Sequence, residues 1–189
     1  MVDTAPTPPV LRPDRPLVRE LTEFAARFAT RQIGASEARV TGITLATADL
    51  RPGEIFVAVP GAVRHGAEFA QRAADLGAVA IVTDESGADR AAHTGLPVIV
   101  VDDPRAQLGA LSAWVYGTDA DMPTLLGITG TNGKTSVSHL VEGMLAALGV
   151  VTGLSSTAER HIAGQIVASR LTTPEASEMH ALLAVMRER

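Results

Sequence analysis

The sequence predicts an α/β fold in two successive parts: a small α/β domain, then the beginning of a second domain built on a parallel sheet. First, short apolar runs typical of buried strands alternate with helical patterns as far as residue 117. Second, the polar segment 117–123 carries glycine and proline, and we place the domain boundary there. Third, the stretch TLLGITGTNGKTSVSHL (124–140) leads from an apolar run through a glycine-rich loop into a helical pattern.

Composition narrows the class of protein. Of the 189 residues, 46% are hydrophobic and 20% are charged, which is enough apolar material for a folded core. A net charge of −5 argues against a nucleic-acid partner, which would require a basic surplus. The sequence has no apolar run long enough for a membrane span, no apolar segment typical of a secretory signal at its start, and no cysteine. Together these features favour a cytoplasmic protein.

The elements of the first part follow from the spacing of apolar residues. Residues 1–16 hold five prolines and predict a disordered or draped tail. After this tail, residues 17–117 form the first domain. We expect, in order, a helix at 17–31, strands at 40–45 and 54–59, a short helix ended by Gly77, buried strands at 78–83 and 97–103 with a short helix between them, and a helix ending near Gly117.

The second part, residues 118–189, has fewer strands than its helices require. We expect a helix after the glycine loop, a strand at 151–156, a hairpin turning at Ala163-Gly164 and a last helix with Pro174 in its first turn. A parallel sheet needs several strands covered by helices on both faces. We therefore expect this domain to be incomplete, with apolar helix faces that lack cover, and to self-associate, bind a partner chain or stay partly mobile.

The glycine loop has the chemistry of a phosphate-binding site. Glycines let backbone N–H groups approach a phosphate, and the following helix N-terminus adds partial positive charge. Lys134 supplies a point charge for the β- and γ-phosphates, and the Thr135 hydroxyl can ligate Mg²⁺. The strict spacing G-x-x-x-x-G-K-[ST] is not met, because Ile128 stands where its first glycine belongs. The alternative is a simple glycine turn between strand and helix with an exposed lysine.

Three motifs together resemble one enzyme family. GITGTNGKTS resembles the ATP loop of the Mur ligases, cytoplasmic enzymes that build the peptide stem of peptidoglycan, and folylpolyglutamate synthetases have similar loops. ITLATADLRPGEIFVAVPGAVRHGAEF (43–69) is similar to the start of the UDP-binding domain in the tripeptide-synthetase branch of that family. LTTPE (171–175) resembles the segment with which the same branch holds the muramoyl peptide. The motifs stand in this order across about residues 40–178.

The resemblance implies an ATP site in the second part and a UDP-substrate site that begins in the first. The implied ATP-binding residues are Gly130, Thr131, Asn132, Gly133, Lys134, Thr135 and Ser136. Among them, Lys134 is the implied catalytic residue and Thr135 the implied ligand of Mg²⁺. The residues implied to bind the UDP substrate are Leu45, Thr47, Ala62, Val63, Arg64, His65, Thr172 and Thr173.

Several of these positions have a plainer alternative. Ala46 and Ala48 replace the Asp and Arg of the family's L-D-S-R motif, so the Thr47 hydroxyl is the polar group that remains. Arg64 and His65 are either diphosphate contacts or solvated side chains in a surface turn. The threonines of LTTPE can equally cap the helix that follows. The histidines outside these motifs show no metal-ligand spacing with one another, so we expect solvated or packed side chains at His93, His139, His161 and His180.

The chemistry implied by the resemblance is ATP-driven amide formation in cell-wall synthesis. The expected partners are UDP-N-acetylmuramoyl-L-Ala-D-Glu and an incoming amino acid, with ATP and Mg²⁺ as cofactors and no nucleic acid or membrane. Further metal ligands and the domain that selects the amino acid lie outside these motifs in the family, so we expect residues 1–189 alone to be inactive. The alternatives are a non-catalytic module that binds a UDP-sugar or ATP, and another Mur or folylpolyglutamate-type ligase.

Overall fold

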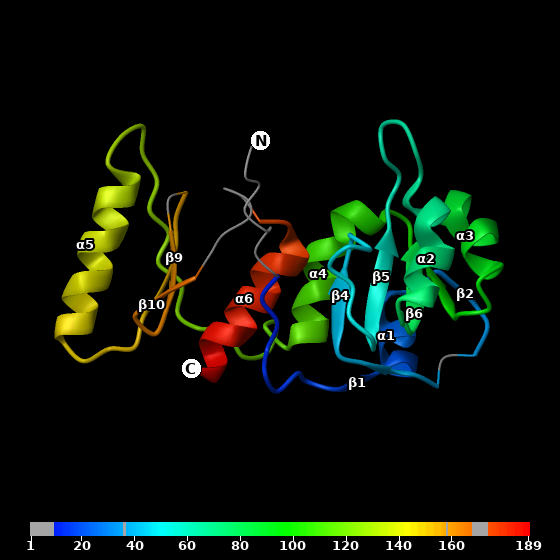
Figure 1. Ribbon diagram of the computed structural model, residues 1–189, viewed down its shortest axis with the longest axis horizontal. Coiled ribbons are helices and arrows are strands. Elements are labelled where there is room, and N and C mark those ends of the chain that lie inside the picture. Colours follow the sequence, from blue (N-terminus) through cyan, green and yellow to red (C-terminus); the bar gives the residue numbers. More distant parts are fainter. Residues whose placement is uncertain (1–9, 36, 158, 168–173) are drawn as a thin grey trace, which may run out of the picture.

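The computed structural model describes residues 10–35, 37–157, 159–167 and 174–189, and it confirms the α/β fold. Figure 1 shows the molecule elongated, with the first part at one end and α5 at the other. The elements of the first part are β1 Arg19–Glu20, α1 Leu21–Phe28, β2 Arg31–Ile33, β3 Arg39–Val40, β4 Gly42–Thr44, β5 Glu54–Ala58, the 3₁₀ helix η1 Gly66–Phe69, α2 Ala70–Asp75, β6 Ala80–Thr83, α3 Glu85–Ala92, β7 Val98–Val100 and α4 Pro104–Tyr116. The elements of the second part are α5 Lys134–Ala147, β8 Gly153–Ser155, β9 Arg160–Ile162, β10 Gln165–Val167 and α6 Ala176–Glu188.

The first part is a three-layer sandwich around a five-stranded sheet. The strand order is β2-β7-β6-β5-β4, with β4 to β7 mutually parallel and β2 antiparallel at the edge. Every residue of β5, β6 and β7 is buried, as their unbroken apolar runs predict. Helices α1 and α4 cover one face of the sheet, whereas η1, α2 and α3 cover the other. The sheet therefore has a packed core on each side.

The first helix is shorter than the sequence indicates. The expectation of a helix over 17–31 is wrong at both ends, because α1 spans Leu21–Phe28 and residues 31–33 form β2. Val100 offers its carbonyl to the Thr30 N–H, and β2 then pairs along β7. Pairing with β7 therefore determines the structure of residues 31–33, although the apolar spacing of the preceding residues favours a helix. The apolar face of α1 still packs as expected, with Phe24 5.6 Å from Trp114 of α4 between ring centroids.

Residues 10–16 are draped over the molecule rather than disordered. Arg12 reaches the first residue of β5, where its Nε lies 2.5 Å from Glu54 Oε1 and both side chains are almost fully buried. Glu54 also accepts a hydrogen bond from the Arg51 N–H. Because a buried charge requires a partner, this pair ties the segment before β1 to the sheet.

The last helix packs on the first part as well as on the second. Ala181 and Ala184 of α6 join the core formed by α1, α4 and the sheet. On its opposite side, Leu182 and Val185 pack with Ile162 of β9. The expectation that α6 would lack cover is therefore wrong. Its start is also later than expected, since Glu175 is the N-cap and Pro174 lies just before the helix.

Arg187 connects the end of α6 to the end of α4. Its guanidinium donates to the carbonyls of Tyr116, Gly117 and Asp121 at 3.0 to 3.1 Å. Gly117 ends α4 in the left-handed conformation expected of a C-terminal glycine, with φ of 69°. A cation at the negative end of a helix dipole, bonded to the carbonyls there, stabilises that end.

The second part forms a small antiparallel sheet next to an exposed helix. Strands β8, β9 and β10 pair in the order β10-β9-β8, and Ala163 and Gly164 make the hairpin turn with positive φ, as predicted. No residue of α5 is buried, which confirms the expected lack of cover for this helix. The apolar run 124–129, which leads into the glycine loop, forms no strand and pairs with none of the described strands. No helix in the described ranges is long and apolar enough to cross a membrane.

Removing the Arg187 contacts should loosen α6 from the first part. We expect Arg187→Ala to lower the free energy of unfolding by about 1.5–3 kcal/mol, the usual size of hydrogen bonds to a charged group. Urea unfolding followed by the fluorescence of Trp114, the single tryptophan and a residue of α4, measures it. Arg189→Ala is the control, because the nearest contacts of its guanidinium are a 3.4 Å bond to Gln165 and a 3.7 Å ion pair with Asp14. Equal effects of the two variants would contradict the assigned role of Arg187.

Candidate functional site

The expected UDP-substrate residues of the first part lie at one edge of its sheet. Leu45 and Thr47 follow the carboxyl end of β4, and residues 62–65 follow the carboxyl end of β5. These two strands are parallel neighbours, so the segments that leave them emerge side by side. Ligands of open α/β sheets bind outside this edge. The tertiary structure thus brings these predicted residues together.

The turn after β4 is held by hydrogen bonds around the predicted contact Thr47. Thr44 Oγ1 accepts from the Ala46 N–H at 3.2 Å, and the Asp49 N–H donates to the Ala46 carbonyl at 3.0 Å. Thr47 lies within this closed turn with its side chain half-buried. Its hydroxyl is therefore carried on a backbone whose conformation is already fixed.

The loop after β5 projects well beyond the sheet (Figure 1). Its base closes where Gly66 N–H donates to the Val59 carbonyl at 2.8 Å, and its tip closes where Gly61 N–H donates to the Arg64 carbonyl at 3.0 Å. Val63 at the tip is 94% exposed. An apolar side chain held this far into solvent has no structural role within the described residues, which fits a loop that meets a ligand or another part of the protein.

His65 anchors this loop to the third helix. Its Nδ1 accepts from the Ala67 N–H at 3.0 Å, so the ring proton is on Nε2, which lies 3.1 Å from Asp84 Oδ1. The alternative of a solvated side chain is wrong for His65, which is only 12% exposed. Arg64 is different, because its side chain is 69% exposed and forms a loose 3.8 Å pair with Glu68. Of the two, Arg64 has the guanidinium available to a ligand.

Asp84 holds His65 in place and is itself held by several hydrogen bonds. It is the N-cap of α3 and accepts hydrogen bonds from the Gly87 N–H, the Ser86 hydroxyl and His65. Partial burial works against ionisation, but these hydrogen bonds outweigh it and hold the pKa of Asp84 below its ordinary value of 3.8. Gly87 is required beside it, because an added Cβ would come within 2.5 Å of the His65 ring. Asp84 was not among the predicted site residues, although an Asp directly before a helical segment is a typical N-cap.

The glycine loop has the backbone that phosphate binding requires. Gly133 is the N-cap of α5 with a φ of 78°, a conformation that favours glycine. An added Cβ at Gly127 or Gly133 would meet no atom within 4 Å, so the loop is open on the outside. The helix N-terminus of α5 therefore faces accessible space with its N–H groups available.

Lys134 folds back over this loop. Its Nζ donates to the Gly130 carbonyl at 2.5 Å and to the Thr131 carbonyl at 3.3 Å. The ammonium group thus already lies across the turn where a phosphate chain would sit. Thr135 is half-buried in the first turn of α5, and Ser138 donates to its carbonyl at 2.8 Å. Lys134, Thr135 and the glycine turn fit a nucleotide phosphate with its magnesium ion.

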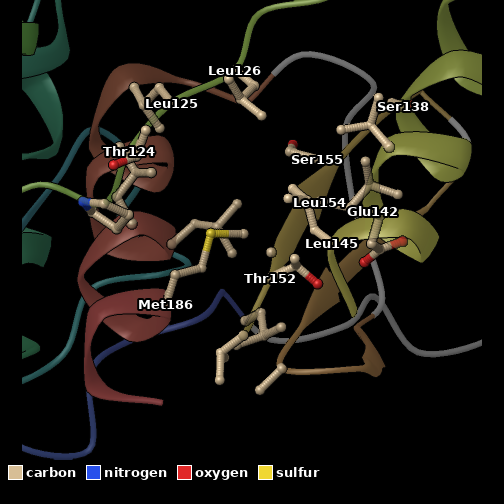
Figure 2. Close-up of a pocket in the computed structure, with 18 of the residues that line it drawn as sticks. Thr124, Leu125, Leu126, Ser138, Glu142, Leu145, Thr152, Leu154, Ser155 and Met186 are labelled. Atoms are coloured by element: carbon tan, nitrogen blue, oxygen red, sulfur yellow. The ribbon is translucent and has the colours of Figure 1, made fainter. Parts of the chain in front are cut away.

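The two predicted regions lie at opposite ends of the molecule but reach the same, upper side of the view in Figure 1. Between them, an apolar cleft of about 550 Å³ separates α6 from α5 and β8. Figure 2 shows Met186 of α6 on one wall, Leu145 and Glu142 of α5 on the other, and Leu154 of β8 between them. The predicted Thr172 and Thr173 contacts lie outside the described residues.

Two of the histidines, His139 and His161, are half-buried, as the packed alternative predicts, and they meet in one cluster with Glu142. His139, Glu142 and His161 have ligand atoms within 4.8 Å of one another and could together hold a metal ion. His139 and Glu142 lie one turn apart on α5, and β9 carries His161. The hydrogen bond to Glu142 is the main cause of a raised pKa at His161, and a second bond to Glu159 adds to it against some desolvation. The spacing His-x-x-Glu on a predicted helix was the sequence signal for this cluster. The third residue, His161, joins it only through the tertiary structure.

Two family models match the chain in succession. The Mur ligase family catalytic domain matches residues 39–116, and the Mur ligase middle domain matches residues 128–189. The chain belongs to the Mur ligase family. A UDP-N-acetylmuramyl-tripeptide synthetase of Leifsonia xyli is 51% identical over 186 residues, or 98% of this chain and 36% of the relative. A UDP-N-acetylmuramoyl-L-alanyl-D-glutamate–2,6-diaminopimelate ligase of Streptomyces avermitilis is 48% identical over 190 residues, again 98% of this chain and 36% of the relative.

A solved structure of the same family supports the fold. The structure of a UDP-N-acetylmuramoyl-L-alanyl-D-glutamate–2,6-diaminopimelate ligase superposes with a TM-score of 0.63 at 21% identity. The match covers 91% of this Mur ligase chain and 34% of the solved chain. The chain thus spans little more than a third of the length of the relatives that it matches.

Asp84→Ala should release the loop after β5 and destabilise the first part. We expect a loss of about 1–2 kcal/mol, the usual cost of removing an N-cap carboxylate. The folded-state pKa of Asp84 is lowered, so its contribution is present above pH 3.8 and disappears as pH falls through the folded pKa. Urea titrations of wild type and variant at pH 7 and at lower pH measure both effects. Asp89→Ala, elsewhere on α3, is the control and should change stability by less than about 0.5 kcal/mol. If the destabilisation caused by Asp84→Ala stayed constant down to acid pH, this role of Asp84 would be contradicted.

Proposed function

We propose that this chain is the first part of an ATP-dependent ligase that adds the third amino acid to UDP-N-acetylmuramoyl-L-Ala-D-Glu. The observation that carries the proposal is identity of 51% and 48%, over 98% of the chain, to relatives whose names describe this step. In this proposal residues 17–117 bind the UDP substrate and residues 118–189 begin the ATP-binding domain. The chemistry of the two candidate regions supports the division.

The proposed reaction has two steps. The free carboxylate of the UDP-linked dipeptide attacks the γ-phosphorus of ATP, the bond to the bridging oxygen breaks, and ADP leaves. The amine of the incoming amino acid then attacks the acyl phosphate, loses a proton, and expels inorganic phosphate as the amide forms. In the first step the transferred phosphoryl group spreads negative charge over its oxygens, so positioning and charge neutralisation dominate catalysis.

The glycine loop supplies both requirements in this proposal. The N–H groups at the start of α5 hold the phosphate chain, and the Lys134 ammonium moves from the Gly130 and Thr131 carbonyls to the β- and γ-phosphate oxygens. Thr135 holds Mg²⁺, which supplies further neutralisation of the phosphates. Because the carbonyls offer only neutral acceptors, anionic phosphate oxygens are the stronger partners for the lysine.

The edge of the first sheet holds the nucleotide end of the substrate. Leu45 and Thr47 contact the uridine, while Ala62, Val63, Arg64 and His65 lie in the loop that covers the diphosphate. Arg64 contributes the charge, and His65 keeps the loop in place through Asp84. Thr172 and Thr173 hold the muramoyl-peptide end. The partners are therefore small molecules, and a cytoplasmic site of action follows from their chemistry in this proposal.

The first test concerns Lys134, the sole lysine of the chain. In the complete ligase, Lys134→Ala should abolish ATP-dependent amide formation while leaving affinity for the UDP substrate unchanged, because the two contacts lie in different parts. Phosphate release and substrate calorimetry measure the two quantities. Arg72→Ala, which removes an exposed cation of α2, should leave both unchanged. Undiminished turnover of the Lys134 variant would rule out the phosphate-loop assignment. If the wild-type protein binds ATP and the UDP substrate without forming amide, the alternative of a non-catalytic module is favoured.

The second test concerns the uridine contact. Thr47→Val removes one hydroxyl at nearly constant volume, so affinity for the UDP substrate should fall about fivefold, equivalent to about 1 kcal/mol for one hydrogen bond. Calorimetry with UDP-N-acetylmuramoyl-dipeptide measures it, and Thr22→Val on the exposed side of α1 is the matched control. Equal affinity of the Thr47 variant and wild type would place the uridine contact elsewhere at this edge, in the 62–65 loop.

A further inference from the structure

The His139, Glu142 and His161 cluster lies apart from the glycine turn and joins two elements that otherwise touch little. His139 and Glu142 project from one side of α5, because residues three apart share a helix face. His161 is the central residue of β9, in the small sheet beside that helix. Helix α5 has no buried residue, and this polar cluster is one of its connections to the sheet.

The ligand atoms of the three side chains converge, and an ion would enter by replacing the hydrogen bond between His161 and Glu142. His161 Nδ1 lies 2.7 Å and 2.9 Å from the two carboxylate oxygens of Glu142. The His139 ring stands edge-on to the His161 ring, with centroids 5.3 Å apart and planes at 76°. All three side chains are partly buried, and the ligand atoms lie within 4.8 Å of one another. Three possible metal ligands from two elements therefore surround one small volume.

A fourth residue orients the central imidazole. His161 Nε2 lies 3.0 Å from Glu159 Oε2 and donates to that carboxylate, so Nδ1 is the nitrogen that faces Glu142 and, once it gives up its proton, can bind an ion. Histidines that bind metals usually donate their other ring N–H to a carboxylate, carbonyl or water, which fixes the ring and raises the basicity of the ligating nitrogen. Glu159 supplies that arrangement here.

We propose that His139, Glu142 and His161 form a site for a divalent transition-metal ion of the zinc class. Two imidazoles and one carboxylate match the ligand preferences of Zn²⁺, and three protein ligands leave a fourth tetrahedral position for water. Mg²⁺ favours an all-oxygen set, so this site is chemically different from the one assigned to Thr135. The bound ion fastens α5 to β9 and, through α5, steadies the helix that begins at the glycine loop.

Binding to such a site is measurable without any enzymatic activity. Protein of residues 1–189, freed of metal by a chelator, is titrated with ZnCl₂ in a calorimeter, and its melting temperature is followed with and without zinc. We expect one equivalent to bind and the melting temperature to rise, because the ion binds the folded state. Excess Mg²⁺ should not displace the zinc. Absence of a one-to-one complex, or displacement by Mg²⁺, would overturn the proposal.

Variants assign the binding to these side chains. His139→Ala, His161→Ala and Glu142→Gln should each weaken zinc binding at least tenfold, whereas His93→Ala, an exposed histidine at the end of α3, should leave it unchanged. Glu142→Gln keeps the side-chain volume, so it remains informative if an alanine variant fails to fold. The visible absorption of bound Co²⁺ gives a second readout, and it should disappear in the same three variants. Wild-type affinity and an unchanged Co²⁺ spectrum in all three would refute the site.

Discussion

The contact between α6 and α4 is the constraint on which the arrangement of the two parts depends. An apolar helix face is stable only against another apolar surface, and α6 finds two: the core of the first part through Ala181 and Ala184, and Ile162 of β9 through Leu182 and Val185. Arg187 fixes the register by bonding the carbonyls at the end of α4. The small sheet packs on α6 through β9, and α6 forms one wall of the apolar cleft of Figure 2.

The first part shows how a packed sheet positions exposed side chains at one of its edges. Its parallel strands are buried on both faces, so the segments that leave their carboxyl ends emerge together from a fixed edge. The loop after β5 extends an apolar residue and Arg64 into solvent, yet its base is held by His65 and Asp84. Charge and hydrogen bonding thus position the loop without burying the side chains that are proposed to meet the substrate.

Helix α5 carries chemistry at two points with little apolar packing to hold it. Its first turn follows Gly133 and begins with Lys134, and its middle carries His139 and Glu142. Val137, Leu140 and Met144 remain exposed along the same helix. Polar contacts to β9 therefore contribute more to the placement of α5 than polar contacts contribute to the placement of α4, which has a buried apolar face. The relatives that this Mur ligase matches are almost three times as long, and the apolar face of α5 is a surface that further chain of the proposed ligase can cover.

The sequence by itself determined the local features: the buried strands β5 to β7, the glycines that end α2 and α4, the hairpin turn at Ala163-Gly164 and the glycine loop with Lys134. Each depends on apolar runs, backbone freedom or spacing within a few residues, and each can be read from neighbours in the chain. Only the tertiary structure decided the long-range features. Residues 31–33 became an edge strand because β7 offered unpaired backbone groups, whereas residues 124–129 pair with no described strand and form none. Likewise, His65 met Asp84 and His161 met Glu142 across 19 residues each, because side chains distant in sequence converge only once helices and sheets have packed.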